Sequence, residues 1–364
     1  YPSEQFKKAH ETANMNVPSG LKTKAEFEAI RDFLRPVMVS IQNSKRILLD
    51  GSTFQNSPAW CIHPLMVEDL IVRNITVRNP WYSQNGDGID IESCKNVLVE
   101  NSKFDVGDDA ICIKSGKDED GRRRGVPAEN IVITNNVVYH GHGGVTVGSE
   151  MSGGVRNIHV SNCTFMGTDV GLRFKSTRGR GGIVENIYIS DIRMTDIPIN
   201  AISFNLYYGG MSVSEMMEKG GLETYAEKEP VTEETPQFRN ITIRDIVVKG
   251  AQQAIFLQGL PEMKLENVVM EDMLLQAEKG ISIIDAENVK LNRIDLITDH
   301  KTAIEILNSR NLEVNSLNYK FEGPQVFTVN GKESENIRLM PSAGFNIKSH
   351  TQLGEEVPES AVEY

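Results

Sequence analysis

The chain has no run of eighteen apolar residues, the length that a membrane-spanning helix needs, so we expect no membrane association. Its N-terminus has neither the basic region nor the apolar stretch of a signal peptide, which by itself says nothing about export. Basic residues do not dominate either. The net charge of -12 argues against a general nucleic-acid binder, which needs a basic face, so we expect no nucleic-acid partner.

The four cysteines lack the paired Cys or Cys/His spacing of a zinc site. Cys112 lies between two isoleucines, and Cys163 lies in another short alternating run. We therefore expect most of these cysteines to be buried, inert thiols in the core.

Helical patterns are scarce as well. One stretch places Phe27, Ile30 and Phe33 at helical spacing before Pro36, which predicts an N-terminal helical segment within residues 1–36.

A phrase of the form Asn-Ile-x-Ile-x-Asn recurs instead, at intervals of roughly 21 to 34 residues. Clear copies begin at Asn74, Asn96, Asn130, Asn157, Asn186 and Asn240. Each copy is followed by a second short stretch with the alternating pattern of a β-strand, such as residues 254–257. Short strands at a regular period, without helices between them, predict an all-β parallel β-helix, a solenoid with one repeat per coil. The repeated Asn is expected to be structural, bonding in ladders or turns at the coil corners.

The repeats predict one β-helical domain over 37–350, followed by an acidic tail over 351–364. Two inserts interrupt the period. Residues 117–129 are expected to form a charged loop, and residues 209–236 contain a helix-like stretch over 213–219 and an acidic run. Inserts in a solenoid tend to form loops on one face, often the face that binds a ligand.

Polar residues gather at the start of, or on, four successive short strands. The clusters are Asn85-Gly86-Asp87, Gly107-Asp108-Asp109, Gly141-His142-Gly143 and Arg173-Phe174-Lys175. If these strands are equivalent in successive coils, the charged side chains form one column on one face. Paired carboxyls of this kind suit glycoside hydrolysis, which needs one protonated group and one that activates water, and crowding is expected to raise at least one pKa.

Other readings of the same acids stay open. Asp87 and Asp90 each fit a turn, and Asp108-Asp109 fits a calcium site. The glycines around His142 leave room for a ligand.

Cations favour an acidic sugar as the ligand. Arg173 and Lys175 lie side by side on one strand face and suit a sugar carboxylate, which indicates a uronic acid. Between Lys114 and Arg180 ten Lys and Arg residues face six acids, a local basic patch in an acidic chain. Arg178 and Arg180 are candidates for a second carboxylate contact. Tyr207 and Tyr208 fit either a sugar-stacking surface or buried packing.

The four clusters resemble, in order, the signature motifs of the polygalacturonase family, family 28 of the glycoside hydrolases. The resemblance implies a right-handed parallel β-helix and metal-free, cofactor-free, inverting hydrolysis of α-1,4-linked galacturonic acid. It implies that Asp108 is the general acid, that Asp87 and Asp109 activate water, and that His142 supports the acid. Further, it implies that Asn85, Arg173 and Lys175 bind substrate.

Details of the resemblance refine these expectations. Gly86 replaces the usual Thr and Phe174 the common Ile, and neither change removes a charge. The insert at 117–129 and the stretch 148–154 resemble bacterial exo-acting members. The N-terminal region is shorter than is usual in the family, so residues 1–36 are expected to be the remnant of a longer N-terminal region. The expected substrate is polygalacturonate or pectic oligosaccharide, the expected location periplasmic or secreted, and the expected state a monomer.

Three alternatives remain at this point. A hydrolase of a branched pectin, rhamnogalacturonan or xylogalacturonan, would use the same fold. A β-helical pectate lyase would cleave by elimination with calcium. A non-catalytic polysaccharide-binding β-helix would have no reason to gather these charges at one strand position.

Overall fold

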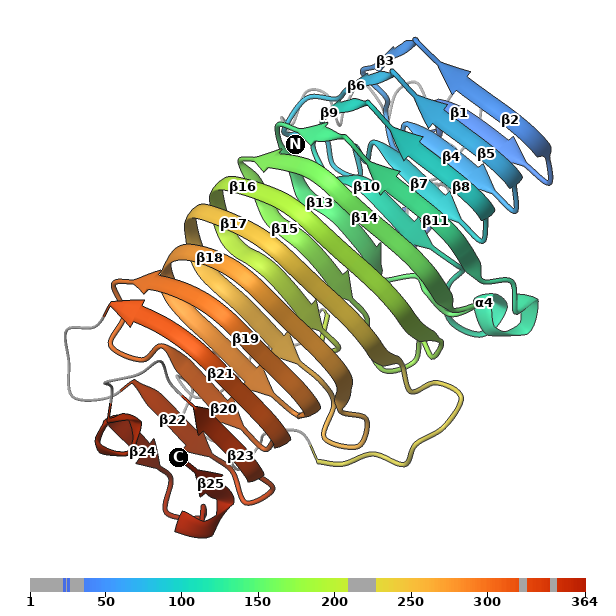
Figure 1. The fold of residues 1–364 in the computed structure, drawn as a ribbon. Coiled ribbons are helices and arrows are strands. Elements are labelled where there is room, and N and C mark those ends of the chain that lie inside the picture. The colour runs from blue at the N-terminus through green and yellow to red at the C-terminus, as the bar shows by residue number, and fades with distance from the viewer. Residues whose placement is uncertain (1–21, 24, 27–35, 209–226, 321–325, 341–345) are drawn as a thin grey trace.

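The computed structural model describes residues 22–23, 25–26, 36–208, 227–320, 326–340 and 346–364. These residues form a right-handed parallel β-helix, as the sequence predicted (Figure 1). Of the expected N-terminal helix only residues 25–26 are described, next to a reciprocal pair of bonds between Thr23 and Glu26 that is typical of a helix start. The helix-like stretch 213–219 lies outside the described residues.

Three faces make up each of the early coils, and every strand pairing is parallel. Face A contains β1 (Val39–Gln42), β4 (Ile62–Leu65), β7 (Ile89–Glu92), β10 (Asp109–Lys114), β13 (Gly141–Gly148) and β15 (Thr168–Lys175). Face B contains β2 (Lys45–Asp50), β5 (Glu68–Arg73), β8 (Lys95–Glu100), β11 (Ala128–Thr134) and the first part of β14 (Val155–Met166). Face C contains β3 (Thr53–Gln55), β6 (Thr76–Arg78), β9 (Lys103–Asp105), β12 (Val137–Val138) and the rest of β14.

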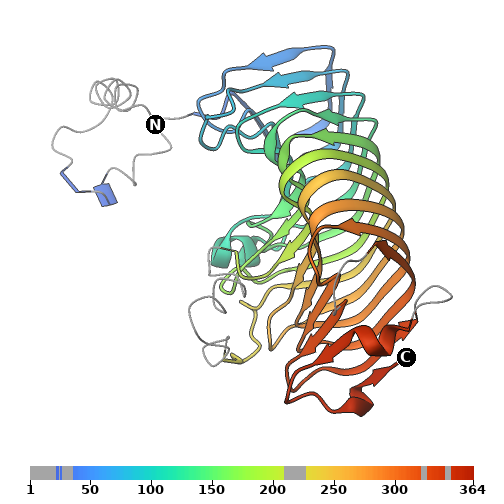
Figure 2. The same ribbon diagram turned by 90° about the vertical axis from the view of Figure 1, so that its left-hand side faces the viewer.

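Later coils are built from longer strands that continue from one face to the next. These are β16 (Ile183–Asn205), β17 (Gln237–Gln258), β18 (Leu265–Ile284) and β19 (Ala286–Thr298). Shorter strands close the solenoid: β20 (Ile304–Leu307), β21 (Arg310–Lys320), β22 (Phe327–Asn330), β23 (Glu335–Met340), β24 (Thr351–Leu353) and β25 (Val362–Glu363). Figure 2 shows the coils stacked from the blue N-terminal end to the red C-terminal end.

The repeated Asn residues occupy the corners of the coils in a left-handed backbone conformation. Asn130, Asn157 and Asn186 have φ of 57°, 58° and 58°, a region that Asn enters more readily than other non-glycine residues. Their amides bond from coil to coil, with 3.1 Å between Asn157 Nδ2 and Asn130 Oδ1. A similar ladder joins Asn267, Asn288, Asn311 and Asn336. The structural role predicted for these residues is confirmed.

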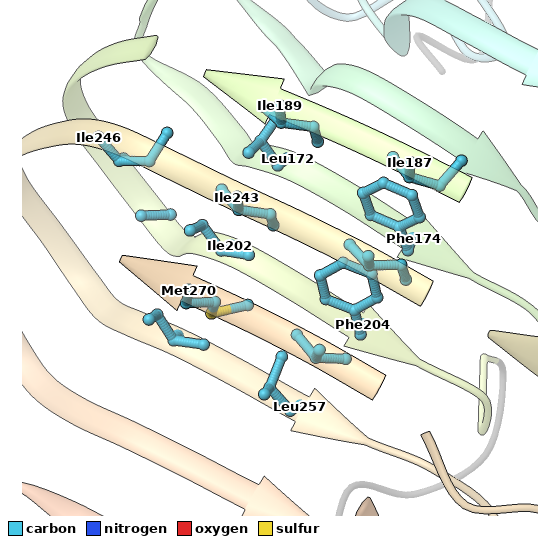
Figure 3. Close-up of a cluster of buried hydrophobic side chains, with 14 of the residues drawn as sticks. Leu172, Phe174, Ile187, Ile189, Ile202, Phe204, Ile243, Ile246, Leu257 and Met270 are labelled. Carbon is cyan, nitrogen blue, oxygen red and sulfur yellow. The ribbon is translucent and has the colours of Figure 1, made fainter. Parts of the chain in front are cut away.

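The core is a set of side-chain stacks along the axis, because alternate residues of each strand point inward. In β11, Ile131 and Ile133 are buried while Val132 is exposed. Figure 3 shows part of these stacks, in which the Phe174 and Phe204 rings lie parallel with 4.2 Å between their centroids. All four cysteines are buried free thiols, as expected.

Two expectations about segments outside the repeat need correction. The insert at 117–129 is not a loop throughout, since it contains the helix α4 (Asp118–Arg124), with three acids in its first turn and three arginines in its last. Both charge groups suit the helix dipole. The acidic stretch 351–364 includes β24 and β25, which pair with β22 and β23, and the short 3-10 helix Glu359–Ala361. It therefore continues the solenoid, preceded by another 3-10 helix at Ile347–His350.

Among the described residues, no helix has both the length and the apolar character needed to cross a membrane.

Candidate active site

Face A brings the four polar clusters together. Cys112 of β10 pairs with Asp90 of β7 on one side and with Thr146 of β13 on the other, and Thr146 pairs with Arg173 of β15. Asp109 opens β10 and pairs with Gly143, the residue after His142. The predicted equivalence of these strands is therefore confirmed, and the charged side chains share one face over four consecutive coils.

Asp109 is the centre of the cluster. Its carboxylate accepts a bond from Lys175 Nζ at 2.7 Å and one from Arg173 Nη1 at 3.1 Å, although both cations lie two coils away. Gly143, on the coil between, makes this reach possible. A Cβ at Gly143 would overlap Thr146 Oγ1 and would lie 2.8 Å from Asp109 Oδ1.

Phe174 keeps the two cations pointing the same way. Successive side chains of a strand alternate, so the burial of Phe174 in the aromatic stack turns both Arg173 and Lys175 outward.

The carboxyls of this cluster differ in their affinity for protons. Burial alone would raise the pKa of Asp109, but the charges of Lys175 and Arg173 outweigh it and hold that pKa below its usual range. Burial raises the pKa of Asp87 well above its ordinary value, and the charges of Asp90 and Asp108 add to the effect. At least one raised pKa was predicted, but its main cause is burial rather than crowding.

His142 connects Asp108 to the next coil. Its Nδ1 lies 3.2 Å from Asp108 Oδ1, and its Nε2 lies 3.7 Å from Asp169 Oδ2. The bond to Asp108 is the main cause that raises the pKa of His142. Asp169 was missed from sequence, although it lies next to Thr168, whose register partner is Gly141.

A buried charge cluster extends face A toward the N-terminus. Lys114 Nζ lies 2.8 Å from Glu150 and 3.7 Å from Asp90, and 4.9 Å from the centre of the Trp60 ring. Burial raises the pKa of Asp90 to about 8 despite the charge of Lys114. From the sequence, Lys114 was expected only as part of a basic patch, and no role was predicted for Glu150. Lys114 of β10 pairs in register with Glu92 of β7, and this alignment of a cation with an acid could have indicated a charge cluster.

The remaining predicted residues divide into two groups. Tyr208 joins the site, since Lys175 Nζ lies 4.9 Å and Arg173 Cζ 5.8 Å from its ring centre. Arg178, with Tyr207 beside it, is bound by both Glu262 oxygens at 2.6 and 2.7 Å, and Arg180 is paired with Asp118. Both arginines already hold protein carboxylates.

Asn85 is half-buried in the loop before β7, with a φ of 53°. It lies two residues before Asp87. Many cations of the predicted basic patch are likewise paired with acids, as Arg124 is with Glu92 and Arg156 with Glu129.

Within the part of the chain that the structure describes, one group of side chains has the spacing of a cation site. Single ligand atoms of Asp87, Asp109 and Cys112 lie within 4.8 Å of one another. Burial raises the pKa of the Cys112 thiol well above its usual range, and Asp109 already holds two cationic side chains. This donor set therefore fits a metal ion poorly.

The fold and these motifs define a class of protein. The model of the glycosyl hydrolases family 28 matches residues 32–293, and the chain belongs to this family.

Individual relatives are similar over part of their length. A probable polygalacturonase of Vitis vinifera is 28% identical over 244 residues, which are 67% of this chain and 47% of the relative. An exo-poly-alpha-D-galacturonosidase of Dickeya chrysanthemi is 26% identical over 318 residues, 87% of this chain and 48% of the relative. The chain thus spans about half the length of these curated relatives.

Similar solved structures include two exopolygalacturonases. The exopolygalacturonase of Thermotoga maritima is 34% identical with a TM-score of 0.61, covering 79% of this chain and 60% of its own. The family 28 exopolygalacturonase of Yersinia enterocolitica has a TM-score of 0.63 at 20% identity, covering 92% of this chain and 51% of its own. The second likeness concerns the fold alone.

Proposed function

We propose that this protein is an exo-acting polygalacturonase that hydrolyses α-1,4-galacturonosidic bonds of pectin with inversion. The observation that carries the proposal is the ionised Asp109 held by Lys175 and Arg173, with Asp87 and the Asp108–His142 pair beside it. Inverting glycosidases need an acid on one side of the bond and a carboxylate that activates water on the other.

The roles follow from the environment of each group. Asp108, partly exposed and bonded to His142, gives its proton to the leaving oxygen. The attacking water lies between Asp87 and Asp109 and loses its proton to this carboxylate pair. Asp109 stays ionised, whereas Asp87 is the stronger base once it is ionised because burial raises its pKa.

The substrate carboxylate binds at Arg173 and Lys175. Each has donors beyond those that it gives to Asp109, and a planar guanidinium beside an ammonium suits a carboxylate. Asn85 contacts the same sugar from the loop before β7. The face of the sugar contacts Tyr208, whose ring lies next to both cations.

Exo action is supported by the names of the Dickeya and Thermotoga relatives. Because a polymer of plant cell walls is met outside the cytoplasm, we also propose a periplasmic or secreted location. The monomeric state stays a prediction.

The test is reducing-sugar release from polygalacturonic acid, with products sized over time. The wild type should release monomer or dimer from the start, and Asp108→Asn should lower the rate by a factor of about 10² to 10⁴ while melting as the wild type does. Mixed oligomers would point to endo action. Release of a 4,5-unsaturated, chelator-sensitive product would indicate a lyase. No release by folded wild type, on branched pectins as well, would contradict the proposal.

A further inference from the structure

A cavity of about 600 Å³ opens beside the column, at the edge where the face A strands begin. Its lining includes Trp81 and Tyr82 from the loop before β7, His140 just before β13, His142 from β13, and Asp169 from β15. Because His142 lines this cavity and also contacts Asp108, the cavity lies next to the column.

The cavity has an exposed aromatic rim. Trp81 is 76% exposed, more than any other large hydrophobic side chain that the structure describes, and Tyr82 is 56% exposed. The two rings meet edge to face with 5.7 Å between their centroids. Aromatic rings with a free face are common partners for sugars, which present apolar C–H faces and polar edges.

The loop that carries this rim is fixed to the column by buried polar bonds. The buried Asn79 donates to the carbonyls of Gly86 and Asp87 and accepts from the backbone of Ser57. The backbone N–H of Gly107, next to Asp108, donates to Gly86. A Cβ at Gly107 would lie 2.5 Å from the Pro80 carbonyl, so this glycine allows the close approach. Trp81 therefore has a set position relative to Asp87 and Asp108.

The polar lining indicates what the cavity recognises. Of the residues described around it, none is Lys or Arg, whereas Ser83, Gln84, His142 and Asp169 offer hydrogen-bonding groups. Such a set suits sugar hydroxyls rather than a carboxylate. The proposed carboxylate-binding cations, Arg173 and Lys175, belong to the column and do not line this cavity.

We propose that Trp81 and Tyr82 form a second sugar subsite, which stacks on the pyranose next to the one held by Arg173 and Lys175 and reads its hydroxyls rather than its carboxylate. This inference rests on the proposed function and adds to it the recognition of a neighbouring sugar. If Trp81 stacks on this second sugar, the affinity for a galacturonide depends on its length as well as on its charge.

The first experiment uses the two tryptophans of the chain, Trp60 and Trp81. In a Trp60→Phe, Asp108→Asn protein the remaining indole reports on the rim alone. Titration with trigalacturonate should change its fluorescence and shield it from an added quencher, whereas galacturonic acid monomer should bind with little change. Binding of the trimer, seen by calorimetry, without any fluorescence response would overturn the proposal.

The second experiment measures affinity by calorimetry for the monomer, dimer and trimer of galacturonic acid in the Asp108→Asn background. Trp81→Ala should weaken trimer binding about tenfold, as expected for the loss of one stacking contact, and leave monomer binding unchanged. Trp81→Phe should recover most of the loss. Tyr188→Ala, which removes an exposed ring stacked on His159 on another face, is the matched control and should change nothing.

Two failures are distinguishable. Equal trimer affinity with and without Trp81 overturns the subsite and leaves the proposed function in place. Absence of galacturonide binding in the protein that retains Trp81 overturns the proposed function, and this inference with it.

Discussion

The corners and face A of the same coils have opposite patterns. At the corners the same residue recurs, so that Asn130, Asn157 and Asn186 bond to one another in a ladder. On face A the aligned residues differ from coil to coil, from Asp90 through Cys112 and Thr146 to Arg173. A side chain that bonds to the same residue type in the next coil stabilises every coil, whereas a catalytic or binding group is needed in one coil only. In this solenoid, the aligned positions at which the residue type changes from coil to coil therefore indicate the candidate site.

Replacement of a glycine on face A should have the largest effect. Gly143→Ala pushes a methyl group against Asp109 and Thr146, so Arg173 can no longer hold Asp109 as it does. We expect polygalacturonate hydrolysis to fall by about a hundredfold. Gly354→Ala, where an added Cβ meets side-chain ends in the last coil, is the control. Near-normal initial rates of a folded Gly143→Ala protein would show that the two-coil reach does not matter.

The buried acid of face A should respond to pH in the opposite sense to a corner acid. The pKa of Asp90 is raised to about 8, so the folded protein keeps a proton that the unfolded chain releases near pH 4. The contribution of Asp90 to the free energy of unfolding therefore falls as pH rises from 4 to 8. Asp90→Asn should remove this loss and be about 1–3 kcal/mol more stable than the wild type at pH 8, with little difference at pH 4.

The control is Asp272, a corner residue whose pKa is lowered by its hydrogen bond to Arg293. Its contribution is present above pH 4 and lost below, so Asp272→Asn should destabilise the protein slightly at pH 8. Thermal melts of both variants across this range decide the point. Parallel pH profiles for wild type and Asp90→Asn would contradict the assignment.

A ladder residue should affect stability and not rate. Asn157→Ala loses the bonds to Asn130 and Asn186 and puts alanine, which tolerates the left-handed conformation less well than asparagine, at this corner, at a cost of about 1–3 kcal/mol in urea unfolding. Asn157→Gly loses the bonds alone and should cost less. The activity per folded molecule should equal that of the wild type in both, and a loss of activity would mean that corners and site are coupled.

The fold could be predicted because each strand pairs with its equivalent in the next coil, so the period of the Asn phrase already contains the register. The same reasoning placed Asp87, Asp109, His142 and Lys175 together. The helix α4 was missed because Gly121 lies in its middle, and glycine is a poor helix former. The charged ends of the helix nevertheless match the helix dipole.

The rest of the site depends on segments outside the repeat. Trp81 belongs to a loop whose position is set by Asn79 and Gly107, and neither contact has a repeat pattern. The partners of Arg178 and Arg180 are similar cases, since Glu262 and Asp118 are distant in sequence and close only in the fold.

The helix α4 also changes how the solenoid should open. Arg122 donates to the Gly179 carbonyl and lies 3.2 Å from Glu234, while Arg124 pairs with Glu92. In Figure 1 this helix stands out from the side of the stack. Strand pairings join only neighbouring coils, but these contacts tie β7 to segments after β15 and before β17. Amide hydrogens across this stretch should therefore exchange as one cooperative block, and the coils that hold the column open together rather than one by one.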